Sequence, residues 1–108
     1  MLIRNNNTPF NACDIVATWL DDAMADMGWR ELMRNDDRQI GKLVAGYEIH
    51  GLLISISAWT QGNCLDVDVL DTQSNAVTLL CVGPCEHPGE VLARLDRLQQ
   101  RIKNAHPR

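Results

Sequence analysis

The amino-acid sequence predicts an α+β fold: an antiparallel sheet of about four strands with an N-terminal and a C-terminal amphipathic helix. Two observations support this prediction. Apolar residues recur at three- and four-residue spacing toward both ends of the chain, which is typical of helices with one buried face. Between these segments, apolar and polar residues alternate at every second position, which is typical of half-buried strands. We therefore expect one domain over residues 1–108, with both helices on the same face of the sheet.

The first helix is expected from about Pro9 or Asn11 to Met27. Two residues compete for its N-cap: Thr8, which precedes a proline, and Asn11, which precedes an acidic residue three positions later. Gly28 is a natural helix end, because glycine readily adopts the left-handed conformation that closes a helix. The opposite face of this helix is rich in aspartate. The apolar stripe consists of Val16, Trp19, Leu20, Ala23 and Met27.

Strands are expected from Gln39 onward, separated by short segments with turn residues. They are Gln39–Ile49, Leu52–Trp59, Cys64–Asp71 and Ala76–Val82. Ahead of them, Met1–Ile3 is a candidate for a short edge strand. Trp29–Arg38 fits either a short helical turn or an irregular strand, because Leu32 and Met33 are adjacent apolar residues that break a two-residue period.

The last of these strands is apolar in both phases of its alternation. Val77, Leu79 and Cys81 form one phase, which we expect on one face of the sheet. Leu80 and Val82 form the other phase, which we expect on the opposite face. A strand that is apolar on both faces lies either in the centre of a sheet or against a partner.

The second helix is expected from about Pro88 to Asn104, with His106–Arg108 fraying beyond it. Three arginines line a face next to its apolar stripe. The stripe consists of Val91, Leu92, Leu95, Leu98 and Ile102.

The net charge of −4 hides an uneven distribution. Residues 1–87 hold five cations and twelve carboxylates, whereas residues 88–108 hold five cations and two carboxylates. An acidic body repels nucleic-acid phosphates, while a basic terminal helix attracts either phosphates or an acidic partner surface. The simpler interpretation is that the helix cations only contact solvent or pair with acids of the same chain.

The four cysteines are expected to be reduced thiols. An even count permits disulfides, but disulfides need a secreted context, and the start of the sequence has no apolar run typical of a secretory signal. A run of about 18 apolar residues, which a membrane-spanning helix needs, is also missing. We therefore expect a cytoplasmic protein with no membrane partner. Cys85, in a loop rich in glycine and proline, is expected to be the most exposed thiol.

Two acidic residues, Asp66 and Asp68, share one face of a predicted strand, with Asp71 beyond them. Paired carboxylates at this spacing are able to hold Mg²⁺ or Ca²⁺. Strict alternation with apolar residues favours the simpler interpretation that they form the polar face of a half-buried strand.

Cys81, Cys85 and His87 place two thiols and an imidazole within seven residues. Their spacing matches no zinc signature, and the other candidate ligands, Cys64 and His50, are distant in sequence. A catalytic pair of Cys85 and His87 lacks an evident orienting acid. We therefore expect no metal site, no cofactor and no catalytic residue.

The sequence favours a non-enzymatic protein-binding module of the adaptor, chaperone, immunity or inhibitor type, acting as a homodimer with another, unidentified protein as its partner. The doubly apolar strand and a tryptophan at a strand end support this interpretation. The candidate contact residues are Trp59, Leu80 and Val82.

The alternative is a nucleic-acid-associated regulator that uses Arg94, Arg97 and Arg101 on phosphates. The second helix has no aromatic residue, so it offers no platform on which bases would stack. This alternative therefore depends on insertion of the basic helix into a groove.

The order of elements loosely resembles that of type III secretion chaperones, with an opening helix, a run of strands and a closing amphipathic helix. Those chaperones generally insert a helix between the third and fourth strands, and Thr72–Asn75 leaves no room for one. Small acidic α+β proteins of this size also include toxin-neutralising immunity proteins and phage-borne inhibitors. No residue motif decides among these groups, so the sequence assigns no family.

Overall fold

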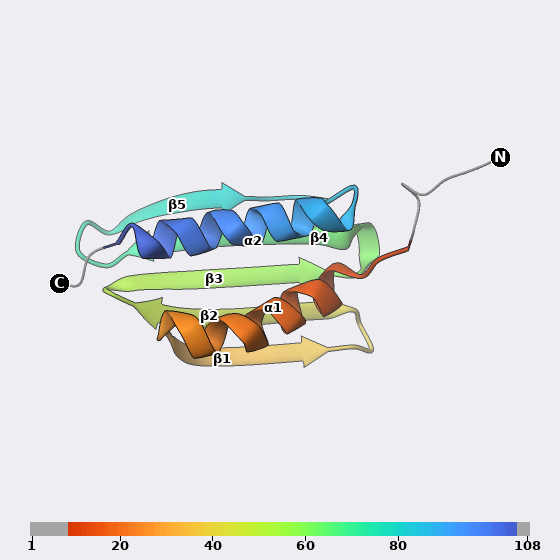
Figure 1. Ribbon diagram of the computed structural model, residues 1–108, viewed down its shortest axis with the longest axis horizontal. Coiled ribbons are helices and arrows are strands. Elements are labelled where there is room, and N and C mark those ends of the chain that lie inside the picture. The colour runs from red at the N-terminus through yellow and green to blue at the C-terminus, as the bar shows by residue number, and fades with distance from the viewer. Residues whose placement is uncertain (1–8, 106–108) are drawn as a thin grey trace.

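The computed structural model describes residues 9–105, apart from the side chains of residues 23–26. Figure 1 shows the helices and strands following one another along the chain. They are α1 (Ala12–Met27), β1 (Arg30–Asp37), β2 (Lys42–Ile49), β3 (Leu52–Trp59), the short 3-10 turn η2 (Gln61–Asn63), β4 (Cys64–Asp71), β5 (Ala76–Cys81) and α2 (Pro88–Lys103). The strand predicted at Met1–Ile3, the N-cap predicted at Thr8 and the fraying predicted at His106–Arg108 lie outside the described residues.

The strands form one antiparallel sheet in the order β1-β2-β3-β4-β5, so each strand pairs with its neighbours in sequence. This sheet has five strands, and the prediction of about four was wrong. The additional strand is β1, in the segment for which the sequence left two possibilities. Its register against β2 shifts between Glu31 and Met33, so Leu32 is the extra residue of a β-bulge. The bulge explains why two adjacent apolar residues occur in a strand.

One face of the sheet is buried beneath the helices. Residues of β2, β3 and β4 alternate strictly between buried and less buried positions. Figure 1 shows α1 and α2 side by side across the sheet, and the buried residues of both helices belong to the same core as this face. The buried positions of the three central strands are Leu43, Ala45, Tyr47, Ile49, Leu52, Ile54, Ile56, Ala58, Leu65, Val67 and Val69. Burial of each large side chain stabilises the fold by roughly 1.5–3 kcal/mol.

The opposite face is not covered by any helix of the described residues, and we call it the open face. Because α1 and α2 both pack into the core on the other side, the open face keeps half-buried and exposed side chains. In strands β2 to β5 it consists of Lys42, Val44, Gly46, Glu48, Leu53, Ser55, Ser57, Trp59, Cys64, Asp66, Asp68, Leu70, Val77 and Leu79.

β5 contains a second bulge, which changes the faces predicted for its residues. Val77 and Leu79 pair with open-face residues of β4, whereas Cys81 pairs with Val67 of the buried face. Leu80 is the extra residue between them, and it packs against the core. The prediction that Val77 and Leu79 share a face with Cys81 was therefore wrong, as was the opposite face predicted for Leu80. A two-residue period cannot continue through an inserted residue.

Asn11, one of the two predicted N-caps, caps the start of α1. The Asn11 Oδ1 atom accepts hydrogen bonds from the amides of Cys13 and Asp14, at 2.9 and 3.4 Å. This side chain satisfies two of the free N–H groups at the helix start. The helix ends at Gly28, whose φ of 67° is the left-handed conformation expected there.

α2 has an apolar stripe one residue narrower than predicted. Val91, Leu95, Leu98 and Ile102 are buried, but Leu92 is 50% exposed. Leu92 lies on the flank that faces α1, where it helps to line a shallow groove between the helices. The stripe predicted through Leu92 was therefore too wide.

Candidate functional site

The most exposed aliphatic side chains of the sheet gather at the β5 side of the open face. Val77 and Leu79 are 67% and 58% exposed, and Val82, just after β5, is 57% exposed. The patch extends from β5 toward the centre of the sheet, because Val77 pairs with Leu70 of β4, and Leu70 pairs with Leu53 of β3. We call these five residues the aliphatic patch.

Two of the three predicted contact residues, Trp59 and the patch residue Val82, line the same hollow at one end of this patch. The hollow has a volume of about 390 Å³ and is completed by the open-face residues Cys64 and Asp66 and by the neighbouring loops. The Lys42 ammonium lies 5.2 Å from the centroid of the Trp59 ring, a cation–π distance that holds the indole against the sheet. Leu80, the third predicted contact residue, packs against the core and does not line this hollow.

The acidic residues of β4 are divided between the two faces. Asp66 and Asp68 lie on the open face, whereas Asp71 pairs with the buried Leu52 and therefore points to the other side. The Asp66 Oδ1 atom accepts the amide of Gly83 at 2.9 Å, so this carboxylate anchors the segment that follows β5. Within residues 9–105, no group of three histidine, cysteine or acidic side chains is arranged to hold a metal ion.

The thiol and the imidazole of the loop before α2 have separate structural roles. Cys85 is only 5% exposed, so the prediction that it is the most exposed thiol was wrong. Its amide donates to the carbonyl of Asn63, which draws the residue into the core. Burial raises the pKa values of Cys81 and Cys85, which keeps both thiols protonated. The His87 Nδ1 atom accepts the Glu90 amide at 3.2 Å and caps α2.

Arg94 has a structural role that its helical spacing did not predict. Its Nη1 atom donates to the carbonyls of Leu65 and Gly83, at 3.0 and 2.8 Å. Its Nη2 atom donates to the Pro84 carbonyl and to the Glu90 carboxylate, both at 3.0 Å. The side chain is 13% exposed. This guanidinium ties the start of β4, the loop after β5 and the first turn of α2 together.

The other two arginines of α2 lie further along the helix. The Arg97 Nη1 atom donates to the carbonyl of Leu80 at 3.0 Å, so the side chain extends from α2 to β5. Arg101 follows one helical turn later and therefore lies on the same flank. This flank of α2 is the one that faces the β5 edge.

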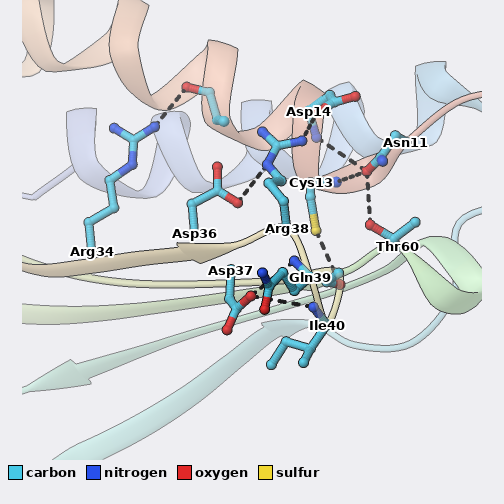
Figure 2. A network of polar contacts seen from close by, with 12 residues as sticks. Asn11, Cys13, Asp14, Arg34, Asp36, Asp37, Arg38, Gln39, Ile40 and Thr60 are labelled. Carbon is cyan, nitrogen blue, oxygen red and sulfur yellow. Dashed lines mark hydrogen bonds and ion pairs between the residues drawn. The ribbon is translucent and has the colours of Figure 1, made fainter.

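At the other edge of the sheet, arginines of β1 and of the turn after it reach α1, and Figure 2 shows Arg38 between Asp14 and Asp36. Arg34 pairs with Asp21 at 2.7 Å and donates to a carbonyl of α1 at 3.3 Å. Arg38 pairs with Asp14 of α1 and, at 2.8 Å, with Asp36 of β1. Asp14 and Asp21 therefore pair with arginines at the β1 edge, while their side chains stay more than half exposed.

The start of α1 is fixed to two loops by a further polar network (Figure 2). Besides capping α1, Asn11 accepts the Thr60 hydroxyl at 3.2 Å. The Asn63 side chain accepts the Ala12 amide at 2.9 Å, and the Cys13 thiol lies 3.6 Å from the Gly41 carbonyl. These contacts fix the position of the start of α1.

Comparison of the chain with protein-family models, curated proteins and solved structures finds no match. Neither α1 nor α2 is both long enough and apolar enough to cross a membrane, within the residues described.

Proposed function

We propose that this chain is a non-enzymatic protein-binding module whose contact surface is the aliphatic patch on the open face. The observation that carries the proposal is the exposure of Val77, Leu79 and Val82, each more than half accessible on a face that neither α1 nor α2 covers. Contact between water and a contiguous apolar patch is unfavourable, and such patches on small domains commonly mark interaction sites. Trp59, beside the patch, adds a side chain of the type that often anchors interfaces.

The roles of the reactive groups support a non-enzymatic protein. The Cys85 thiol is buried with a raised pKa, and the His87 imidazole is committed to capping α2. The Asp66 carboxylate is bonded to a backbone amide. Groups that a nucleophilic or metal-dependent mechanism would use therefore serve the fold.

We further propose that the module acts as a cytoplasmic homodimer, with a second copy on the open face. A twofold axis would place the aliphatic patches of two copies against each other, so self-association and binding of another protein would compete for this surface. The four free thiols fit a reducing compartment.

The arginines of α2 support the nucleic-acid alternative only weakly. Arg94 already binds three carbonyls and one carboxylate, so it has little capacity left for a phosphate. Arg97 and Arg101 remain, on a chain whose net charge is −4. Two arginines on an acidic body give a weak electrostatic basis for binding nucleic acid.

Affinity capture from a lysate of the source organism, with and without nuclease, tests the protein-binding role. The baits are the wild type, Leu79→Lys in the patch, and Ile40→Lys as the matched control, because Ile40 is 70% exposed at the β1–β2 turn. We expect the wild type and the control to retain a stoichiometric protein after nuclease treatment, and Leu79→Lys to lose it. Equal retention by all three baits, or a catch that nuclease removes, would contradict the proposal.

Sedimentation equilibrium tests the homodimer separately. The wild type and Ile40→Lys should sediment with twice the monomer mass, while Leu79→Lys should sediment as a monomer. A monomeric wild type at all concentrations would refute self-association and leave binding of another protein untouched.

A further inference from the structure

The β5 edge of the sheet lacks two of the features that normally prevent an edge strand from pairing, charged residues and proline, and its bulge lies near one end, at Leu80. Within residues 9–105, β5 pairs with β4 on one side only, so every second residue turns its backbone N–H and C=O groups outward. None of its six residues is charged, and none is proline. Ala76 to Leu79 pair with β4 in continuous register, so this stretch is regular.

The two sides of this edge differ in chemistry. On the helix side, the Arg97 guanidinium reaches the Leu80 carbonyl, and Arg101 lies one turn along the same flank of α2. Figure 1 shows α2 running along β4 and β5. On the other side, Val77 and Leu79 present exposed aliphatic groups. A strand added at this edge would therefore have cations next to one of its faces and aliphatic side chains next to the other.

From this arrangement we propose that β5 binds an extended segment of a partner protein as a sixth strand, in which acidic and apolar side chains alternate. The inference rests on the proposed protein-binding function and names the chemistry of the partner. Alternate residues of a strand point to opposite faces. Carboxylates on one face would meet Arg97 and Arg101, and apolar side chains on the other would extend the row of Val77 and Leu79.

Arg97 lies at the end of the regular stretch of β5. Its bond to the Leu80 carbonyl lies at the bulge, where the continuous register of β5 with β4 ends. A guanidinium has five N–H donors, and the remaining donors of Arg97 are available to a carboxylate of the bound strand. The site thus combines a short ladder with a charge contact at its end.

A second copy of this chain fits the β5 edge less well than an acidic segment. Pairing of β5 with β5 of a second copy, related by a twofold axis, would place the α2 helices of the two copies side by side. Arg97 and Arg101 of both copies would then repel each other, whereas a segment with carboxylates attracts them. The homodimer proposed above uses the open face and leaves this edge free.

Fluorescence polarisation with labelled peptides tests this inference. The probe is a peptide of about ten residues that alternates valine and aspartate; the controls replace aspartate with lysine, or the central valine with proline. The wild type should bind the aspartate peptide at least about tenfold more tightly than either control, with affinity falling as salt rises. Arg97→Glu/Arg101→Glu should lose the aspartate peptide and bind the lysine peptide, while Arg30→Glu, on the β1 edge, should behave as the wild type.

Three outcomes would overturn the inference. If the aspartate peptide fails to bind, or if the aspartate and lysine peptides bind with equal affinity, β5 does not bind an acidic strand. A wild-type dimer that Arg97→Glu/Arg101→Glu strengthens would instead assign the edge to a second copy. None of these results bears on the protein-binding role itself, which fails if Leu79→Lys leaves the capture unchanged or if nuclease removes the captured material.

Discussion

The two edges of the sheet are built from opposite kinds of residue. None of the six residues of β5 is charged, whereas five of the eight residues of β1 are charged. The charged residues of β1 are Arg30, Glu31, Arg34, Asp36 and Asp37. Charges on an edge strand oppose pairing with another chain, because pairing would remove them from water. The comparison indicates that β1 terminates the sheet and that β5 leaves it able to accept a further strand.

The arginines differ between the same two regions. Near β1, Arg38 pairs with Asp14 and Asp36 where all three side chains stay accessible to water. Near β5, Arg94 is 13% exposed and bonds to three carbonyls and a carboxylate. Exposed ion pairs contribute little to stability, whereas removal of a buried donor leaves its acceptors unsatisfied. The β1 region should therefore tolerate substitution better than the region around Arg94.

The largest expected effect comes from Leu95→Asp, which breaks the core that supports both edges. Leu95 is 0% exposed, so a carboxylate there would be buried without a partner, and destabilisation by more than about 4 kcal/mol should unfold the domain. Circular dichroism and urea denaturation measure this. The control is Leu92→Asp, half exposed on the same helix, which should change stability by less than about 0.5 kcal/mol. A cooperatively folded Leu95→Asp variant would refute the assigned core face of α2.

The next largest effect is a difference in stability between substitution of Arg94, near β5, and of Arg38, near β1. Arg94→Ala should lower the free energy of unfolding by about 2–3 kcal/mol, because the carbonyls of Leu65, Gly83 and Pro84 lose a charged donor. Arg38→Ala removes an exposed guanidinium and should have a much smaller effect. Urea denaturation of both variants measures the two losses in the free energy of unfolding. Equal losses at the two positions would contradict the contrast between the regions.

A pH effect is expected from Tyr47, on the strand that pairs with β1. Burial raises the pKa of this phenol, as does its hydrogen bond to the Glu31 carboxylate at 3.0 Å. A raised folded-state pKa stabilises the fold below the unfolded pKa near 10, and that stability is lost as pH rises beyond about 10. Because Tyr47 is the only tyrosine, the ultraviolet absorbance of tyrosinate reports it alone. Ionisation near pH 10 in the folded protein, or the same alkaline loss of stability in Tyr47→Phe, would contradict this account.

The smallest expected effect concerns the thiols near β5. Because burial raises the pKa values of Cys81 and Cys85, both should react slowly with an alkylating reagent at neutral pH. Cys64 is less buried and should react first. Mass spectrometry of partially alkylated protein, with urea-unfolded protein as the control, gives the order in which the cysteines react. Cys85 reacting first would indicate an accessible, activated thiol and reopen a catalytic role.

The regular parts of the fold follow from residue patterns. The alternation predicted the bounds of β3 and β4, because each strand keeps a two-residue period, whereas β2 begins at Lys42, three residues after the predicted start at Gln39. Asn11 predicted the start of α1 through a local side-chain contact that depends on few other residues.

The irregular parts could not be predicted because they depend on pairing across strands. The extra residues at Leu32 and Leu80 are identified only from the register against β2 and β4. For that reason the sequence misplaced Val77 and Leu79, which form the centre of the candidate site. The absence of charge in β5 was a usable signal for an open edge. Nothing local to Cys85 reveals that Asn63, more than twenty residues away, binds its amide.

Amide hydrogen exchange along both edges, with and without the alternating valine–aspartate peptide, tests the contrast between β1 and β5 most directly. Exchange slows when an amide becomes hydrogen-bonded. The account predicts that amides within Ala76–Leu79 gain protection when the peptide is added, and that Arg30–Asp37 is unchanged. Equal protection of both edges, or protection gained at β1 alone, would contradict the claim that β5 is the edge at which this protein binds a partner strand.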